Sequence, residues 1–258
     1  HEKALLKWWA EDSDEQLKDL DAAQPVLEPA IEVLIGRGNP EADEVEFELV
    51  EKQENDGAIA MSGLVRNLTH GEEIPAAFLH PANWNGKVVI WLFPDGKAAL
   101  HQLEEADQLV REGIAVMSLD LLGQGESLNG GENAKVQYPG DATKPGAEWR
   151  KSSVYFYGYN HSLFAKRVHD ILTCVSFIRN HPKWEVKEVS LVGLSGAGHW
   201  AAAARAVAGD HIEKAAISAG GFRFANLESD WDADFLPGAV KYRDVDGFVS
   251  LAARHSLW

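Results

Sequence analysis

The sequence VSLVGLSGAG at residues 189–198 joins a short apolar run to an alanine-rich segment that begins at His199. The apolar run predicts a buried strand, and the segment at 199–207 predicts a helix. A serine at the tip of such a turn needs small residues two positions before and after it, which Gly193 and Ala197 provide. The pattern favours Ser195 as an exposed nucleophile, with a structural serine or a phosphate site as the alternatives. The glycines do not form G-x-G-x-x-G, and no G-K-[ST] follows, which disfavours nucleotide sites.

Two loops are expected to supply backbone donors around Ser195. The helix that follows this serine points free N–H groups and the positive end of its dipole at the space above the hydroxyl. The sequence FPDGK at 93–97 follows another apolar run, where an acyl-transfer site needs a second N–H donor. We therefore predict an oxyanion hole made by the amide of Gly196 and that of Asp95 or Gly96. The sequence does not decide between the last two.

The remaining pattern predicts an open α/β sheet that is mostly parallel and flanked by helices. Four apolar runs lack alternation, as in strands buried on both faces, and they lie at 88–93, 114–119, 189–192 and 215–218. Helical segments are expected between them, at 100–111, 163–179 and 199–207. Alternating or apolar segments upstream predict antiparallel strands at 45–49, 59–65 and 74–79.

We expect two segments along the chain. Residues 1–42 read as an N-terminal helical cap, in which an amphipathic helix is followed by a loop with Pro25, Pro29 and Pro40. Residues 43–258 form the α/β domain. Within it, residues 129–150 are rich in Gly, Pro, Asn and Asp and predict a long surface excursion. The excursion is too polar for the apolar lid that a lipase would carry.

Composition excludes several classes of partner. The 258 residues include 24 Lys and Arg against 40 Asp and Glu, a formal net charge of -16. Nucleic acid and anionic membrane surfaces are therefore disfavoured, and no apolar run approaches the roughly 18 residues of a membrane span. Cys174 is the only cysteine, so no disulfide framework or cysteine-rich metal site is expected. His80, Asp95 and His101 lack a metal-ligand spacing, and we predict neither metal nor cofactor.

Several motifs together resemble a known family. DLLGQGES at 120–127 resembles the D-x-x-G-x-G-x-S stretch of α/β-hydrolases, and GLSGA at 193–197 resembles their nucleophile elbow. With PDGK at 94–97, GYN at 158–160, RVHD at 167–170 and FLPGA at 235–239, the chain from Val45 onward resembles bacterial acetyl xylan esterase-like serine hydrolases. The glucuronoyl esterase elbow is also similar, but it has arginine directly after its serine, where this chain has Gly196.

The resemblance implies an α/β-hydrolase fold and a serine esterase that removes acyl groups, above all acetyl groups, from a small-molecule or polysaccharide carbohydrate ester. It favours a secreted or periplasmic location. Three alternatives stay open. Two are enzymes of the same fold, a glucuronoyl-type esterase and a peptidase or lipase. The third is a non-catalytic binding module that keeps the elbow but lacks the triad. Asp120 is not expected to be catalytic, and its loop is either a turn at the sheet edge or a loop that faces substrate.

The resemblance places the acid after the next-to-last strand and the catalytic histidine after the last one. SLW at 256–258 resembles the opening of the strand that carries the acid. The C-terminal part of the domain is therefore expected to be missing from this sequence, so that a C-terminal segment or a second chain completes the site. The alternative is His255 as base, preceded by aspartates at 230, 232, 234, 244 and 246.

Candidates for substrate contact are His199, Trp200, Tyr159 and Trp231, which lie beside the elbow or in loops. Sugar sites use flat aromatic faces, whereas core or loop packing is the alternative for the two tryptophans, and helix capping is the alternative for His199. Arg167 and Asp170 are expected to form a structural ion pair on their helix.

Overall fold

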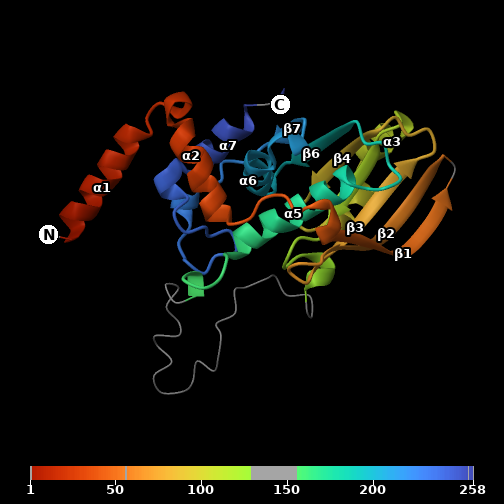
Figure 1. The fold of residues 1–258 in the computed structure, drawn as a ribbon, viewed down its shortest axis with the longest axis horizontal. Helices are drawn as coiled ribbons and strands as arrows, with labels where there is room; N and C mark the ends of the chain where they lie inside the picture. Colours follow the sequence, from red (N-terminus) through yellow and green to blue (C-terminus); the bar gives the residue numbers. More distant parts are fainter. Residues whose placement is uncertain (1, 56, 129–155, 255, 258) are drawn as a thin grey trace, which may run out of the picture.

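The computed structural model describes residues 2–55, 57–128, 156–254 and 256–257, and the excursion expected at 129–150 lies outside them. In the described part, an eight-stranded sheet has the order β1-β2-β3-β5-β4-β6-β7-β8 (Figure 1). The strands are β1 (Val45–Asn55), β2 (Ala58–Asn67), β3 (Glu72–Pro81), β4 (Lys87–Leu92), β5 (Ala115–Leu119), β6 (Glu188–Gly193), β7 (Lys214–Ile217) and β8 (Ser256–Leu257).

The sheet changes from antiparallel to parallel pairing at β5. β1 pairs with β2, β2 with β3, and β3 with β5, all antiparallel, whereas β5, β4, β6, β7 and β8 are parallel to one another. The five parallel strands bring their carboxyl ends to one edge, where the loops of the candidate site begin. The predicted mostly parallel α/β sheet is confirmed.

Helices cover both faces of the sheet. The helices are α1 (Glu2–Gln16), α2 (Leu20–Ile35), α3 (Glu104–Arg111), α5 (Leu163–Arg179), α6 (Gly198–Ala208) and α7 (Asp244–Ala252). Ala76, Phe78 and Met117 belong to the large core with α2, α5, α6 and α7. Their strand neighbours Ala77 and Val116 belong to a second cluster with Ala106 of α3. Because successive side chains of a strand point to opposite faces, these strands are buried on both sides.

The N-terminal segment differs from the expectation in one respect. α2 includes Pro25 and Pro29, so the loop expected around these prolines is a helix. Each proline removes one backbone donor. A stripe of side chains four residues apart is nevertheless buried in the core, and its members are Ala23, Leu27, Ile31 and Ile35. Burial of this stripe outweighs the lost hydrogen bonds.

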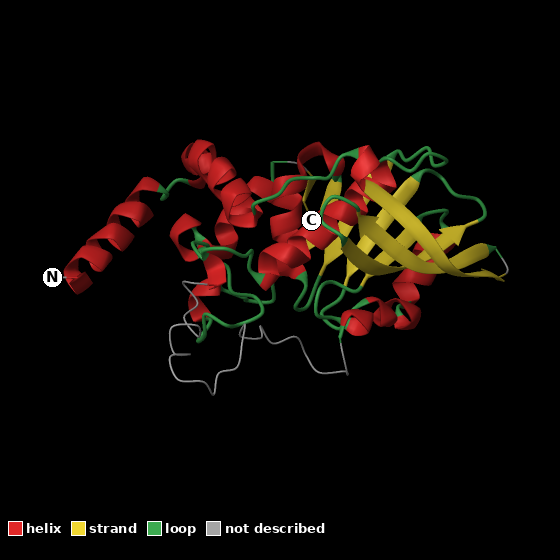
Figure 2. Cartoon of the chain, turned by 60° about the horizontal axis from the view of Figure 1, so that its bottom comes forward, coloured by secondary structure: helices red, strands yellow, loops and turns green. Residues whose placement is uncertain are grey.

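α1 contributes little to the core. It projects away from the rest of the molecule (Figure 2), and both Trp8 and Trp9 on it are 55% exposed. It touches the short helix η7 (Val240–Tyr242), where the Ser13 hydroxyl donates to the Lys241 carbonyl oxygen. α2 is therefore the part of the N-terminal segment that covers the domain. Among the described helices, none is long and apolar enough to cross a membrane.

Candidate active site

Ser195 stands at the apex of the turn between β6 and α6. Its φ angle is 45°, and only two other non-glycine residues in the described chain, Arg243 and Asp244, have a positive φ. An L-residue in this region is strained and persists only where the surroundings enforce it. The Ser195 side chain is exposed. The turn therefore presents a hydroxyl to solvent at the carboxyl edge of the sheet, as the sequence predicts.

Small residues around Ser195 are required by close packing. A Cβ atom on Gly193 would lie 2.4 Å from Cβ of Ala201, and one on Gly198 would lie 2.1 Å from the carbonyl oxygen of Ser218. Ala197 is fully buried between them. The first turn of α6 thus packs directly on β6 and on the chain that follows β7, and this packing fixes the position of Ser195.

Gly198→Ala is expected to lower the free energy of unfolding by about 2 kcal/mol or more, because backbone must move to make room for the methyl group. The matched control is Gly38→Ala, since a Cβ atom there would meet nothing within 4 Å. Urea denaturation of both variants measures the effect. Equal midpoints for the two variants would show that the elbow is not tightly packed.

A pocket of about 320 Å³ lies beside Ser195. Loops that follow β4, β5, β6 and β7, together with one residue each of α5 and α6, form its wall: Pro94, Asp95, Gly123, Gln124, Gly125, Leu128, Arg167, Gly196, Trp200, Ala233 and Asp234. The structure therefore brings together three of the predicted site residues, Asp95, Gly196 and Trp200. The loop at 120–127 contributes through Gly123, Gln124 and Gly125, so it does face the pocket.

Two backbone amides are free to act at this pocket. Within the described residues, neither the Asp95 nor the Gly196 amide donates a hydrogen bond to another group of the chain. The Gly96 amide donates to the Phe93 carbonyl oxygen over 3.4 Å, and Gly96 is buried with its Cα against Asp120. Of the two predicted alternatives, Asp95 therefore has the more available donor.

Asp234 anchors the inner wall of the pocket. One of its carboxylate oxygens, Oδ1, accepts hydrogen bonds from Trp200 Nε1 at 2.7 Å and Arg167 Nη1 at 3.1 Å. The other, Oδ2, lies 3.3 Å from His199 Nε2. Burial by itself would raise the pKa of Asp234, but His199, Arg167 and Trp200 outweigh it and lower that pKa below its ordinary value. Asp234 is thus held as a carboxylate.

Arg167 pairs with Asp234 and not with Asp170, which corrects the ion pair expected on the helix. Its Nε also donates to the Leu122 carbonyl oxygen at 3.1 Å, and its guanidinium lies 4.6 Å over the Trp200 ring. Asp170 instead accepts a hydrogen bond from the Leu122 amide at 2.7 Å. Both side chains extend from α5 to Leu122 in the loop after β5. Arg167 and Asp170 therefore each bond to this loop, although they lie only three residues apart on the helix.

Asp170 is buried, and this burial raises its pKa from 3.8 to about 7 despite the Leu122 hydrogen bond. Between pH 4 and 7 the carboxyl group ionises in the unfolded chain but stays protonated in the folded one. The parent protein therefore loses stability relative to Asp170→Asn as the pH rises through this window. We expect the Tm of Asp170→Asn, measured relative to that of the parent, to rise by on the order of 5 °C from pH 4 to pH 7. The exposed control Asp43→Asn should show no such trend, and a constant difference for Asp170→Asn would contradict the assignment.

Of the residues predicted to contact substrate, His199 and Tyr159 do not line the pocket, and Trp200 lines it with little exposed surface. His199 is buried, and its ring stacks on Phe222 with 4.1 Å between centroids. It does not belong to the pocket wall. Trp200 is only 3% exposed, and Arg167 covers one face of its ring, so it has no open ring face on which a sugar could stack. Tyr159 is 88% exposed and stands clear of the wall.

Trp231 belongs to a cluster of aromatic rings near the pocket mouth. Its ring centroid lies 5.7 Å from that of Phe156 and 6.2 Å from that of Tyr157, which in turn lies 5.4 Å from Phe235. The Tyr157 hydroxyl donates to the Asp230 carbonyl oxygen at 2.7 Å, and burial raises its pKa to about 12. The cluster ties the loop at 230–235 to the segment at 156–157 and so supports Asp234.

The catalytic histidine considered at position 255 lies outside the described residues. Its neighbour Ser256 pairs with Lys214, the first residue of β7, whereas Ser195 follows the carboxyl end of β6. β8 therefore begins at the edge of the sheet opposite Ser195 and runs toward the edge of the pocket. In the described ranges, no group of three or more His, Cys, Asp or Glu is arranged to hold a metal ion.

Comparison by sequence finds no matching family profile and no matching curated protein. Comparison of structures finds similar folds. A candidate acetyl xylan esterase from Bacteroides fragilis has a TM-score of 0.63 at 12% identity, covering 93% of this chain and 67% of that one. Acetyl xylan esterase 1 from Thermoanaerobacterium has a TM-score of 0.51 at 15% identity, covering 89% and 72%.

A glucuronoyl esterase from Solibacter usitatus is also similar, with a TM-score of 0.57 at 12% identity over 89% of this chain and 72% of that one. Identities this low show a shared fold and leave the reaction to the site itself. The resemblance to these esterases is therefore confirmed at the level of fold. With its sheet order and these similarities, the chain has the α/β-hydrolase fold.

Proposed function

We propose that this protein is a carbohydrate esterase that removes acetyl groups from a saccharide ester through an acyl-enzyme on Ser195. The observation that carries the proposal is the strained, exposed Ser195 beside a pocket lined by Gly196 and Asp95. The backbone N–H groups of these two residues donate no hydrogen bond within the described chain. Strained backbone at a solvent-facing nucleophile is typical of catalytic serines on this kind of turn. The esterases with similar folds support the same reaction class.

In the proposed reaction, Ser195 Oγ attacks the ester carbonyl carbon and its proton passes to a general base. The negative charge that develops on the carbonyl oxygen is stabilised by the amides of Gly196 and Asp95 and by the N-terminus of α6. The tetrahedral intermediate collapses, the base returns the proton to the leaving sugar hydroxyl, and acetyl remains on Ser195. Water then attacks the acyl-enzyme through the same steps and releases acetate.

The base in this proposal is a histidine outside the described residues. Because β8 runs parallel to β7, residues that follow β8 would emerge at the edge where Ser195 lies. We therefore place the base and its acid on a segment after β8 or on a second chain, in preference to His255. His199 is a poorer base because it is buried under Phe222 and Trp200 and faces Asp234.

The substrate in this proposal is a neutral saccharide ester. The net charge of -16 and the exposed carboxylate of Asp95 at the pocket disfavour anionic substrates, whereas the Asp234 carboxylate is balanced by Arg167. Rates of release from acetylated xylo-oligosaccharides, a methyl ester of a glucuronic acid and a long-chain aryl ester distinguish the alternatives. We expect the acetylated sugar to have the highest kcat/KM. A preference for the glucuronate ester or for the long acyl chain would overturn the assignment, and binding without turnover of any of them would indicate a binding module.

A further inference from the structure

The loop at 93–97 contains the Asp95 amide. Two side chains of the loop at 120–127, Gln124 and Asp120, form hydrogen bonds to this loop on either side of Asp95. The Gln124 side chain is 4% exposed and donates through Nε2 to the carbonyl oxygens of Pro94 at 2.8 Å and Phe93 at 3.3 Å. The Gln124 side-chain oxygen in turn accepts from the Leu121 amide at 3.1 Å. This side chain therefore uses both its donor group and its acceptor to join the two loops.

Asp120 holds the same loop on the other side of Asp95. Its carboxylate, 2% exposed, accepts hydrogen bonds from the Lys97 amide at 2.7 Å and from the Glu126 amide at 3.0 Å. The space for this carboxylate is set by two glycines, because a Cβ atom on Gly96 or Gly125 would lie 2.3 Å from it. The close fit leaves the carboxylate a single position.

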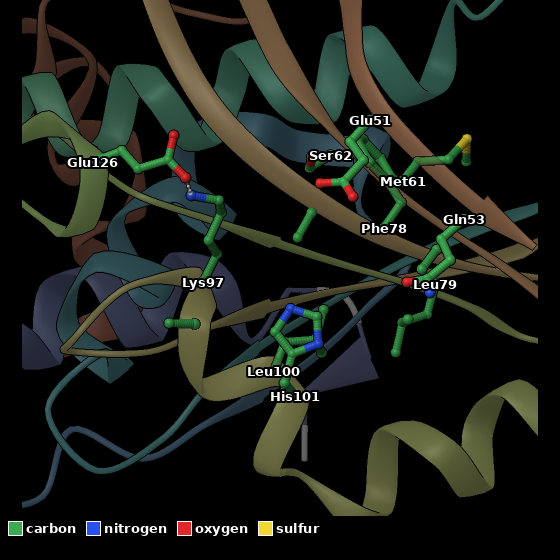
Figure 3. Close-up of a pocket in the computed structure, with 13 residues that line it drawn as sticks. Glu51, Gln53, Met61, Ser62, Phe78, Leu79, Lys97, Leu100, His101 and Glu126 are labelled. Carbon is green, nitrogen blue, oxygen red and sulfur yellow. Dashed lines mark hydrogen bonds and ion pairs between the residues drawn. The ribbon is translucent and has the colours of Figure 1, made fainter. Parts of the chain in front are cut away.

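Lys97 neutralises the buried Asp120 carboxylate. Its ammonium group lies 2.7 Å from Asp120 Oδ2 and also pairs with Glu126. Figure 3 shows Lys97 and Glu126 pointing toward each other at one end of a second pocket, whose lining does not include Ser195. An uncompensated carboxylate here would oppose the negative charge of an oxyanion, so the pairing removes a repulsion as well as holding the loop.

We infer that Gln124 and Asp120 are positioning residues, which fix the backbone of residues 93–97 so that the Asp95 amide points into the oxyanion hole. This inference rests on the proposed function. Its structural basis is the hydrogen bonding on both sides of Asp95. The carbonyl oxygens of Phe93 and Pro94 accept from Gln124, and the Lys97 amide donates to Asp120. The Asp95 amide itself donates no hydrogen bond within the described chain. A donor fixed in advance stabilises the oxyanion without reorganisation during the reaction.

The test is Gln124→Met, which keeps the volume of the side chain but removes its donor and acceptor. Removal of one oxyanion donor typically lowers kcat by about 100-fold to 1000-fold, and a displaced donor should lower it by roughly 10-fold to 100-fold. We expect that loss in kcat with KM changed by less than about 3-fold, because the ground-state ester does not use the hole fully. Affinity for a boronic acid, which forms a tetrahedral adduct on Ser195, should fall by about the same factor as kcat.

The matched control is Gln108→Met on α3, where an exposed glutamine donates to Glu112 Oε1 at 3.1 Å away from the pocket. Gln124→Glu is the second variant, since it keeps the shape and replaces the donor by an oxygen that repels the Phe93 and Pro94 carbonyls. It should lose kcat and boronate affinity as Gln124→Met does. The positioning role alone would be overturned if both Gln124 variants kept kcat and boronate affinity within twofold of Gln108→Met while the activity of the parent still required Ser195. A parent whose activity does not require Ser195 would overturn the proposed function and this inference together.

Discussion

Ser195→Ala is expected to lower kcat for acetylated saccharides by at least about 10⁴-fold, with the fold and the melting temperature retained. The hydroxyl is the only protein group in the proposed reaction that forms a bond to the acyl carbon, and the amides that remain can supply only the residual oxyanion stabilisation. Loss of one exposed hydroxyl removes no buried contact, so stability should change little. Steady-state kinetics with and without the substitution give the result, and differential scanning calorimetry reports the fold.

The matched control is Ser190→Ala, which replaces a half-buried serine on β6, the strand that leads to Ser195; its hydroxyl lies 3.4 Å from Glu188 Oε1. It should retain the activity of the parent within about twofold, as substitutions away from the site usually do. If Ser195→Ala is as active as Ser190→Ala, Ser195 is not the nucleophile, and the strain at φ 45° must have a structural origin.

Asp234→Ala should have the second-largest effect, with a loss of about 3 kcal/mol or more in the free energy of unfolding. Removal of this carboxylate leaves the Arg167 guanidinium, whose side chain is 7% exposed, without its counter-charge, and leaves Trp200 Nε1 without its acceptor. Breaking one partner of a buried ion pair is far more destabilising than the pair is stabilising. Because Arg167 and Trp200 both line the pocket beside Gly196, esterase activity should fall as well.

Glu28→Ala serves as the control for Asp234→Ala. Glu28 pairs with Arg254 at 2.7 Å, but both side chains are about half exposed. Solvent screens such a pair, and its removal should change stability by less than about 1 kcal/mol. Chemical denaturation of both variants at pH 7 measures the difference. Similar unfolding free energies for the two would show that the Asp234 cluster does not hold the pocket together.

The parallel part of the fold could be predicted because each strand is apolar throughout and each helix is bounded by polar turns. Ser195 could be placed as well, since small residues two positions before and after it leave few alternatives to a tight turn. α2 could not be predicted from local signals. Pro25 and Pro29 normally end a helix, and only burial of the side chains on their opposite face keeps this one helical.

The inner wall of the pocket was missed for a different reason. Asp234 lies 17 residues after β7 in a segment without periodicity, and its partners Arg167 and Trp200 come from two helices. The only signal in the sequence is the alternation of aspartates at 230, 232 and 234, which does not tell which one turns inward. Similarly, the choice between the Asp95 and Gly96 amides depends on a hydrogen bond to Phe93 that no residue type reveals.

Labelling of Ser195 by a fluorophosphonate probe tests the central claim most directly. The measurement uses the natural protein with any residues that follow Trp258 present, and peptide mass mapping locates the probe. We expect a single adduct on the peptide that contains Ser195, and no adduct in Ser195→Ala, because only a serine paired with a base and an oxyanion hole reacts readily. An unlabelled protein, or an adduct on another residue, would contradict the assignment of Ser195 as the activated nucleophile.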